Sequence, residues 1–376
     1  MHIRQVEVFP LALPMKQSFS ISGGTVGDRN RGAPHVYVKL TDDDGHVGWG
    51  EARPSPRWSY ETLESVVSTI EGYLAPLLIG RSVEDLRTIR QAMNRDIAGS
   101  THPGQPIAKA AVDLALHDLL CKRRGLALPA LWTAPFRESI RLSYLISTTD
   151  PEEAARKAER AAQEGYAGID VKIGLAPSKD IDVLNAVRQA AGNLFLRVDA
   201  NQAYDLGTAS KIARHLERIG ADVFEQPLPA GDLFGHRELR RKTNVPIALD
   251  ESVWTPADVI RAVRMEACDA AVIKVTKMGG LAGAKLAGEI AAEAGLTLLG
   301  GGLTESRLGL AASGHLFQYL QIAHPVDLNG PMFLEDDPVE EGPTIEGGKV
   351  TLRPSPGIGC TISERKLQQY RKAPGS

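Results

Sequence analysis

Three strand-like runs of this chain end in an acidic residue, and the acids recur at nearly constant spacing. The runs end at Asp199, Glu225 and Asp250, so successive acids lie 26 and 25 residues apart. That spacing is the length of one strand-loop-helix-loop unit of a βα barrel. The strands of such a barrel are parallel, and their carboxyl ends meet in one mouth, where barrel enzymes carry out their chemistry. We therefore expect the three carboxylates to converge.

A lysine ends the strand-like run on either side of these three. Lys172 ends the upstream run Gly168–Lys172, and Lys274 ends the downstream run Ala270–Lys274. A lysine that is partly desolvated beside a bound cation has a lowered pKa and can act as a base near neutral pH. The alternative role of each lysine is a structural ion pair with the acids.

The three acids predict a site for a divalent cation. Clustered carboxylates repel one another unless a cation neutralises them. Hard oxygen ligands suit Mg²⁺, with Mn²⁺ as a possible substitute, and no cysteine or histidine stands at these strand ends to favour zinc. Each acid on its own has a plainer alternative, as a helix cap or as the partner of a neighbouring arginine.

The order of the predicted elements indicates an α/β protein with three parts. Residues 1–130 read as strands followed by helices, which is typical of an α+β domain. Residues 131–326 alternate between strands and helices and predict a modified (β/α)7β barrel of the TIM type, with a weak eighth strand around 321–323. Residues 327–376 lose this alternation, and we expect them to pack back on the first domain.

Composition excludes several classes of protein. A net charge of −3 with no basic block gives no reason to expect nucleic-acid or membrane partners. The three cysteines form neither a metal-spaced pair nor a disulfide framework. The N-terminus alternates like a strand and has no long apolar region, so we expect no signal peptide and a cytoplasmic location.

The motifs around these residues resemble the enolase superfamily, and in particular its muconate lactonizing enzyme-like subgroup. The resemblance covers nearly the whole chain and includes Val47-Gly-Trp-Gly-Glu51 in the region that matches the family's capping domain. The barrel motifs are Asp170-Val-Lys172, Val198-Asp199-Ala-Asn201, Phe224-Glu225-Gln-Pro, Leu249-Asp250-Glu251-Ser, Ile273-Lys274-Val-Thr-Lys277 and Gly301-Gly-Leu-Thr-Glu305-Ser.

The resemblance implies a reaction and a role for each matching residue. A substrate carboxylate would bind Mg²⁺, and a lysine would remove the proton α to it to give an enediolate, whose negative charge the cation stabilises. Lys172 matches the second-strand base and Lys274 the sixth-strand base. Asn201 and Glu251 would orient the metal ligands. Glu305 would lie at the mouth near the substrate, or alternatively would pair with Arg307 or form a hydrogen bond within its loop.

The chain departs from the family pattern at the second strand. Members of the family usually have Lys-x-Lys there, whereas this chain has Asp170-Val-Lys172. A carboxylate beside Lys172 should keep that lysine protonated. Lys172 would then serve as an acid or an electrostatic partner, with Lys274 as the main base. Alternatively, Asp170 points away into an ion pair of its own.

Three further residues bear on the substrate. Dipeptide epimerases of the subgroup usually carry Asp-x-Asp after the eighth strand to hold the substrate ammonium, and this chain has Asp327-Leu-Asn329. Asp327 would pair with a cationic nitrogen or act only as a turn residue. In the capping domain, Arg57 would meet a second carboxylate and Trp58 would supply an apolar or cation-binding wall, unless both are ordinary surface residues. The loop 20–31 is expected to close over the substrate.

These observations predict a Mg²⁺-dependent isomerase acting on a small carboxylate. The leading expectation is a racemase or epimerase of an N-substituted amino acid or a related acid, acting as a homo-oligomer. The same site would also serve cycloisomerisation of a muconate-type dicarboxylate or dehydration of a hydroxy acid. More distant alternatives are an aldolase that forms a Schiff base on lysine, and a metal-binding protein without turnover.

Overall fold

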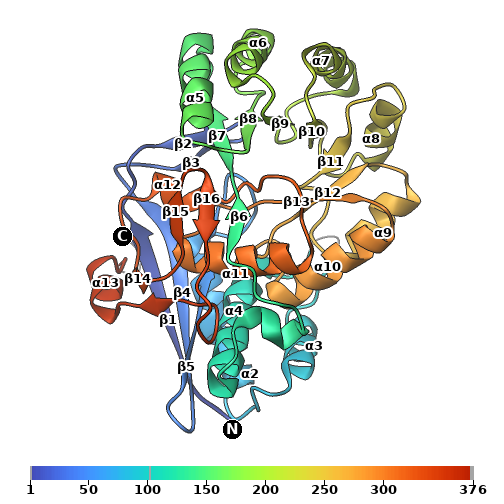
Figure 1. Ribbon diagram of the computed structural model, residues 1–376. Helices are drawn as coiled ribbons and strands as arrows, with labels where there is room; N and C mark the ends of the chain where they lie inside the picture. The colour runs from blue at the N-terminus through green and yellow to red at the C-terminus, as the bar shows by residue number, and fades with distance from the viewer. Residues whose placement is uncertain (1, 101–102, 373–376) are drawn as a thin grey trace.

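The computed structural model describes residues 2–100 and 103–372 (Figure 1). The N-terminal part contains a three-stranded antiparallel sheet in the order β1-β4-β5. These strands are β1 (Ile3–Leu13), β4 (Ala33–Asp42) and β5 (Val47–Ala52). Strands β4 and β5 are joined by a tight turn, as their antiparallel pairing allows.

Helices cover one face of this sheet. They are α1 (Leu63–Thr69), a π-helical turn (Ile70–Leu74), α2 (Ala75–Leu78), α3 (Leu86–Asp96) and α4 (Pro106–Arg124). Helix α4 lies so close to β5 that a Cβ atom at Gly50 would stand 1.9 Å from the carbonyl oxygen of Ala111. The glycines of the Gly-Trp-Gly motif therefore allow the helix to pack directly on the strand.

The predicted loop 20–31 is in fact a small hairpin for much of its length. Its strands are β2 (Phe19–Ile21) and β3 (Gly24–Gly27), and they pair antiparallel. The sequence prediction missed these strands because they are three and four residues long and rich in glycine and serine. Three hydrogen bonds hold this hairpin against the barrel and the capping domain. They run from Ser22 Oγ to Asn201 O (2.8 Å), from Ser147 Oγ to Ser20 O (2.6 Å) and from Arg53 Nη2 to Val26 O (2.8 Å).

The second part is a barrel of alternating strands and helices, as the acid spacing predicted. Its parallel sheet runs in the order β13-β12-β11-β10-β9-β8-β7, and the helices surround it on the outside (Figure 1). The strands are β7 (Ser143–Ser147), β8 (Gly168–Lys172), β9 (Phe195–Asp199), β10 (Val223–Glu225), β11 (Ile247–Leu249), β12 (Ala270–Ile273) and β13 (Thr297–Gly300). The helices that follow them are α5 (Pro151–Gln163), α6 (Asp180–Ala191), α7 (Leu206–Ile219), α8 (Leu233–Arg240), α9 (Pro256–Arg264), α10 (Leu281–Glu293) and α11 (Arg307–Tyr319).

A short segment after α11 closes the barrel. Val326 forms a parallel bridge with Leu142, and Asp327 forms one with Gly301, so the segment joins the first and seventh strands. The expected eighth strand at 321–323 is wrong in position, since those residues form the turn after α11. The backbone reaches the sheet only beyond Pro325, which explains why the apolar residues at 321–323 misled the prediction.

The C-terminal segment packs beside the first sheet and the start of the barrel. It contains α12 (Gly330–Phe333), β14 (Val339–Glu341), β15 (Thr344–Glu346), β16 (Lys349–Thr351), β17 (Thr361–Ile362) and α13 (Glu364–Gln369). Strand β16 pairs with β6 (Ser139–Arg141) before the barrel, and the backbone N–H of Ala12 donates to Tyr370 O at 3.0 Å. Within the described residues, no helix is long and apolar enough to cross a membrane.

Candidate active site

The three strand-end acids lie side by side in the mouth of the barrel. Asp199 ends β9, Glu225 ends β10 and Asp250 follows the last residue of β11. Parallel pairing sets Asp199 directly beside Glu225 and also beside Lys172 on β8. All three carboxylates are fully buried, so their charge is shielded from water and depends on neighbouring side chains.

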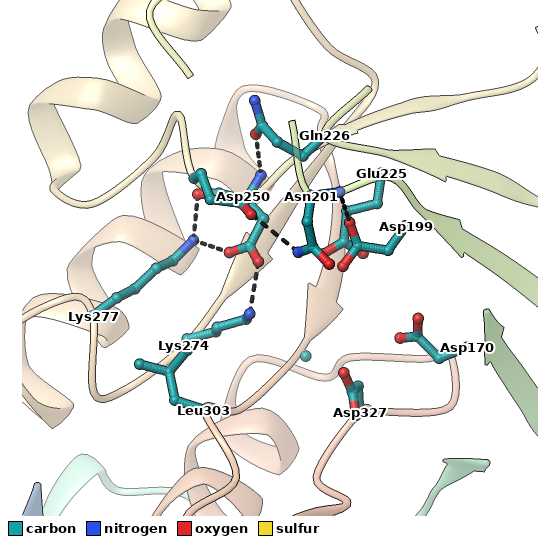
Figure 2. Close-up of polar contacts among 12 residues, drawn as sticks. Asp170, Asp199, Asn201, Glu225, Gln226, Asp250, Lys274, Lys277, Leu303 and Asp327 are labelled. Atoms are coloured by element: carbon teal, nitrogen blue, oxygen red, sulfur yellow. Dashed lines mark hydrogen bonds and ion pairs between the residues drawn. The ribbon is translucent and has the colours of Figure 1, made fainter. Parts of the chain in front are cut away.

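Each predicted lysine contacts the acid nearest to it. Lys172 Nζ lies 2.6 Å from Asp199 Oδ2. Lys274 Nζ lies 2.6 Å from Asp250 Oδ2, as Figure 2 shows. Burial alone would lower the pKa of Lys172, but the surrounding carboxylates, Asp170 foremost, hold that pKa well above its ordinary value. Asp250 likewise raises the pKa of Lys274 against burial, an effect that a cation held by Asp250 would oppose.

Glu225 lies between these two ion pairs, and its surroundings indicate whether a cation fits among the three acids. Its Oε2 bonds to the buried guanidinium of Arg197, whereas its Oε1 has no hydrogen-bond partner among the described residues. Burial, reinforced by the carboxylates of Asp199 and Asp250, raises the pKa of Glu225 well above its ordinary value. A buried carboxylate oxygen without a donor, between two other acids, suits Mg²⁺, and these three residues would hold it.

A second cluster, of two aspartates and a histidine, brings its possible metal-ligand atoms close together but does not suit a metal ion. Asp42, Asp44 and His46 place ligand atoms within 4.8 Å of one another in the turn between β4 and β5, and no other such trio occurs in the described part of the chain. Asp44 and His46 are exposed, and Arg123 already forms ion pairs with Asp42 and Asp44. The arginine supplies the positive charge that this turn requires.

Asn201 and Glu251, which the resemblance assigns to orienting the metal ligands, lie beside the strand-end acids. The backbone N–H of Asn201 donates to Asp199 Oδ1 at 2.8 Å, and its side-chain Nδ2 donates to Glu251 Oε1 at 3.0 Å. Burial, together with the nearby Asp250, raises the pKa of Glu251 to about 8. Asn201 therefore links one strand-end acid to a carboxylate beside another.

The sequence reasoning missed three buried residues that hold the acids in place. Lys277 Nζ donates to Asp250 Oδ1 at 2.6 Å and to Asp250 O at 2.7 Å. Gln226 Oε1 accepts from the backbone N–H of Asp250 at 2.9 Å (Figure 2). Arg197 could have been found, because it lies two residues before Asp199 and so faces the same side of the strand.

Asp170 lies inside the mouth. Its carboxylate is fully buried, 3.5 Å from Lys172 Nζ and 3.3 Å from Arg197 Nε. Both contacts lack hydrogen-bond geometry, and neither Asp170 oxygen has a hydrogen-bond partner in the described chain. Burial raises the pKa of Asp170 to about 6 despite the two cations. Asp170 therefore does not point away from Lys172, although it also lies within ion-pair distance of Arg197.

A cavity of about 40 Å³ lies at the catalytic end of the barrel. Lys172, Lys274, Asp327 and Asn329 supply its polar wall. The hairpin and the loop after β5 close its other side with apolar side chains, namely Phe19, Ile21, Val26 and Trp58. Lys274 Nζ lies 4.7 Å from the centre of the Trp58 ring, which is cation-π contact. The cavity therefore presents both lysines to one small space with one polar and one apolar side.

The remaining predicted residues lie further from this cavity. Arg57 is exposed and lines an outer cavity of about 330 Å³ that also includes Trp58, Asn201 and Glu251. Glu305 is buried behind the wall, where it accepts hydrogen bonds from Thr276 Oγ1 (2.7 Å) and the backbone N–H of Leu303 (2.7 Å). Its alternative partner Arg307 pairs with Asp337 instead.

A buried glutamate of the N-terminal sheet fixes the loop that carries Glu305. Glu51 on β5 accepts from Ser306 N (2.8 Å), Ser306 Oγ (2.7 Å) and Gly309 N (2.8 Å). These donors belong to the N-terminal turn of α11, where backbone N–H groups have no partner within the helix. The N-terminal sheet thus caps a helix of the barrel and holds the two parts together beside the mouth.

Comparison with known proteins agrees with this geometry. Residues 153–366 match the family described as enolase C-terminal domain-like, and residues 3–132 match the mandelate racemase / muconate lactonizing enzyme N-terminal domain. The chain is 32% identical to an L-Ala-D/L-Glu epimerase of Clostridium acetobutylicum, over 96% of this chain and 98% of the relative. It is 30% identical to a chloromuconate cycloisomerase of Cupriavidus necator, over 99% and 100% of the two chains.

Solved structures show the same fold along the whole chain. The N-succinyl Arg/Lys racemase of Bacillus cereus has a TM-score of 0.93 at 28% identity, with 99% of both chains covered. The dipeptide epimerase of Cytophaga hutchinsonii, solved with Mg and the dipeptide D-Ala-L-Val, has a TM-score of 0.92 at 28% identity, again covering 99% of both chains.

Fold and site together define an α/β-barrel isomerase with a capping domain. The chain belongs to the enolase superfamily, within its muconate lactonizing enzyme-like subgroup. The predicted fold class, family and enzyme class are thereby confirmed.

Proposed function

We propose that the protein is a Mg²⁺-dependent racemase or epimerase that acts at the carbon α to a carboxylate, on an N-substituted amino acid or a related acid. The observation that carries the proposal is the placement of Lys172 and Lys274 on opposite flanks of the acid trio, with both lining one cavity. Two amines on opposite sides of a substrate can serve as proton acceptor on one face and proton donor on the other.

The residues of this chain divide the work between them. Asp199, Glu225 and Asp250 would hold the cation, which when bound would draw the substrate carboxylate into the mouth and stabilise the negative charge that develops there. Lys274 takes the α-proton, and Lys172, which Asp170 favours in its ammonium form, delivers a proton to the opposite face. The hairpin β2–β3 and Trp58 exclude water from the cavity while the proton moves.

Cycloisomerisation is the second candidate, because the relatives include a chloromuconate cycloisomerase at a similar level of identity. That reaction would use one lysine and change the carbon skeleton, whereas an epimerase returns the same skeleton. Dehydration of a hydroxy acid would release water from the same site. The racemase and epimerase relatives support the first proposal.

Proton exchange distinguishes these reactions. In D₂O with Mg²⁺, the protein should introduce deuterium at the α-carbon of N-acylamino acids or dipeptides. NMR of the recovered substrate measures this exchange. Lys274→Ala should abolish the exchange, and Asp199→Asn, Glu225→Gln and Asp250→Asn should each lose activity with an unchanged circular dichroism spectrum. Normal exchange in Lys274→Ala would show that the base is another residue.

Removal of the metal gives an independent test. Chelation with EDTA should stop the exchange, and added Mg²⁺ should restore it. A Schiff-base aldolase would keep its activity in EDTA and would be trapped by borohydride with substrate. A metal-binding protein without turnover would show no exchange to lose.

We further infer that the protein is a homo-oligomer in the cytoplasm that acts on a small carboxylate. We also infer a division into a capping domain at 1–130, a barrel at 131–326 and a C-terminal segment at 327–376. The contacts of the C-terminal segment with β1 and β6 support this division. Expression of residues 131–372 alone tests whether the barrel depends on the capping domain: removal of residues 1–130 takes away Glu51, which caps α11, and should leave the fragment poorly folded.

A further inference from the structure

The loop that carries Trp58 is held at both of its ends by the N-terminal part of the protein. At its start, Arg53 Nη2 donates to Val26 O of the hairpin at 2.8 Å. At its end, the fully buried carboxylate of Glu61 accepts from two backbone N–H groups in the first turn of α4, at 2.7 and 3.0 Å. The residues between these anchors, 54–60, need a contact of their own to stay over the mouth of the barrel.

Trp58, in the middle of this loop, packs on Trp254 of the barrel. The two ring centres lie 5.2 Å apart with the rings tilted by 37°, a distance and tilt at which aromatic rings attract one another. Tyr60 lies on the same indole, with its ring centre 6.1 Å from that of Trp254. Trp254 belongs to the loop between β11 and α9, shortly after Asp250. The contact therefore joins the capping domain to the barrel at the edge of the mouth.

The position of Trp254 is fixed independently of Trp58. The indole Nε1 of Trp254 donates to Glu251 O at 2.8 Å, and its backbone N–H donates to Asp258 Oδ2 at 3.1 Å. Asp258 forms a capping box with Thr255 at the start of α9, so the backbone acceptor is itself held in place. Because its ring and its backbone are both held, Trp254 loses little conformational freedom when Trp58 packs on it. Trp254 is therefore a rigid support for the loop.

Trp58 in turn contacts the lysine to which we assign removal of the α-proton. Lys274 Nζ lies 4.7 Å from the centre of the Trp58 ring, and both residues line the active-site cavity. A catalytic group must keep its position closely, since a displacement of about 1 Å can cost about 100-fold in rate. Trp254 lines a separate cavity of about 300 Å³, so its route to the reaction runs through Trp58.

We propose that Trp254 is a positioning residue that keeps Trp58 closed over the mouth and thereby holds Lys274 in place for proton transfer. The effect on the reaction rests on the proposed function, whereas the contact between the two rings can be tested without a substrate. An aromatic pair of this kind changes an equilibrium about fivefold. Removal of the Trp254 ring should therefore make opening of residues 54–60 about fivefold more frequent.

Hydrogen exchange of backbone amides in the metal-free protein tests the contact. The N–H groups of Trp58 and Ser59 both donate to Ser55 O, at 2.9 and 2.7 Å, and report opening of the loop. Trp254→Leu should speed the exchange of both amides about fivefold. Trp254→Phe keeps an aromatic face toward Trp58, so exchange should stay within about twofold of that in the wild-type protein.

Kinetics of deuterium exchange at the substrate α-carbon test the effect on the reaction. With Mg²⁺ and the best substrate, Trp254→Leu should lower kcat at least about fivefold and change KM less than about twofold, because the lost ring contacts Trp58 and not the substrate. Trp254→Phe should restore most of kcat. Trp132→Leu is the matched control, since it removes a similar ring pair, with Tyr319 at 5.3 Å, at the end of α11 away from the mouth. It should change neither kcat nor exchange in the loop.

The two measurements separate this proposal from the proposed function. Unchanged amide exchange in a folded Trp254→Leu overturns the proposal, and so does an unchanged kcat, whatever happens to KM. A kcat as low in Trp254→Phe as in Trp254→Leu overturns the role of the ring face. If the wild-type protein exchanges no compound, the proposed function fails, and amide exchange still decides whether Trp254 holds Trp58. If Trp254→Leu does not fold, unprotected Trp58 and Ser59 amides in the wild-type protein overturn the proposal.

Discussion

The contact between Glu51 and helix α11 makes a quantitative prediction about stability. Glu51→Ala removes the acceptor of three hydrogen bonds and leaves the backbone N–H groups of Ser306 and Gly309 buried without a partner. A buried donor that loses its acceptor costs about 1–3 kcal/mol. Two such donors, partly relieved by the Ser306 side chain, predict a loss of about 3 kcal/mol in the free energy of unfolding.

Urea unfolding at pH 7 measures this loss, and hydrogen exchange at the two amides locates it. Both amides should exchange faster in the variant, whereas those at the centre of α11 should change less. Glu71→Ala, a change at an exposed helical glutamate, should cost less than about 0.5 kcal/mol and serves as the control. A loss below about 1 kcal/mol in Glu51→Ala, with unchanged exchange at Ser306 and Gly309, would refute the assignment of the helix cap.

Three other perturbations have defined outcomes. Lys277→Met should lower the free energy of unfolding by about 3 kcal/mol in urea, because Asp250 loses a buried partner; an unchanged midpoint would contradict this. Burial raises the pKa of Glu61 to about 7, so the stability gained from its protonation is complete below pH about 4.3 and is lost as pH rises through 7. Glu61→Gln should therefore gain stability relative to wild type between pH 5 and pH 8 in urea titrations, and a constant difference would argue against the shift. Ser22→Ala should raise KM about fivefold with little change in kcat, because the hairpin loses one hydrogen bond to Asn201; kinetics on the best substrate check this against Ser68→Ala.

The sequence predicted the positions of the site residues correctly where the regular repeat of strand and helix in the barrel determines them. Asp199, Glu225 and Lys172 end their strands, and Asp250 and Lys274 follow theirs directly, so a regular spacing was enough to bring these five side chains to one mouth. The same logic placed the helices that surround the sheet. The family was indicated separately, by the resemblance of the motifs at these strand ends to those of the enolase superfamily.

Contacts between segments that are far apart in the sequence could not be predicted. Glu51 and Ser306 are 255 residues apart, and no local pattern indicates that one caps the helix of the other. The closing segment at Val326 and Asp327 contributes only single bridges, so it has no strand-like period to detect. Asp170 was flagged as a departure, but its contacts with both Lys172 and Arg197 depend on how two neighbouring strands align.

The first strand of the chain is completed by its last described residues. The backbone N–H of Lys372 donates to Pro10 O at 2.9 Å, and Leu11 bridges Arg371. These pairs close a loop of about 360 residues, and closing so long a loop costs chain entropy. We therefore expect the pairs to form late in folding. During synthesis the N-terminal strand therefore leaves the ribosome long before its edge partner exists. Until Arg371 and Lys372 are made, that edge stays open to pairing with other nascent chains.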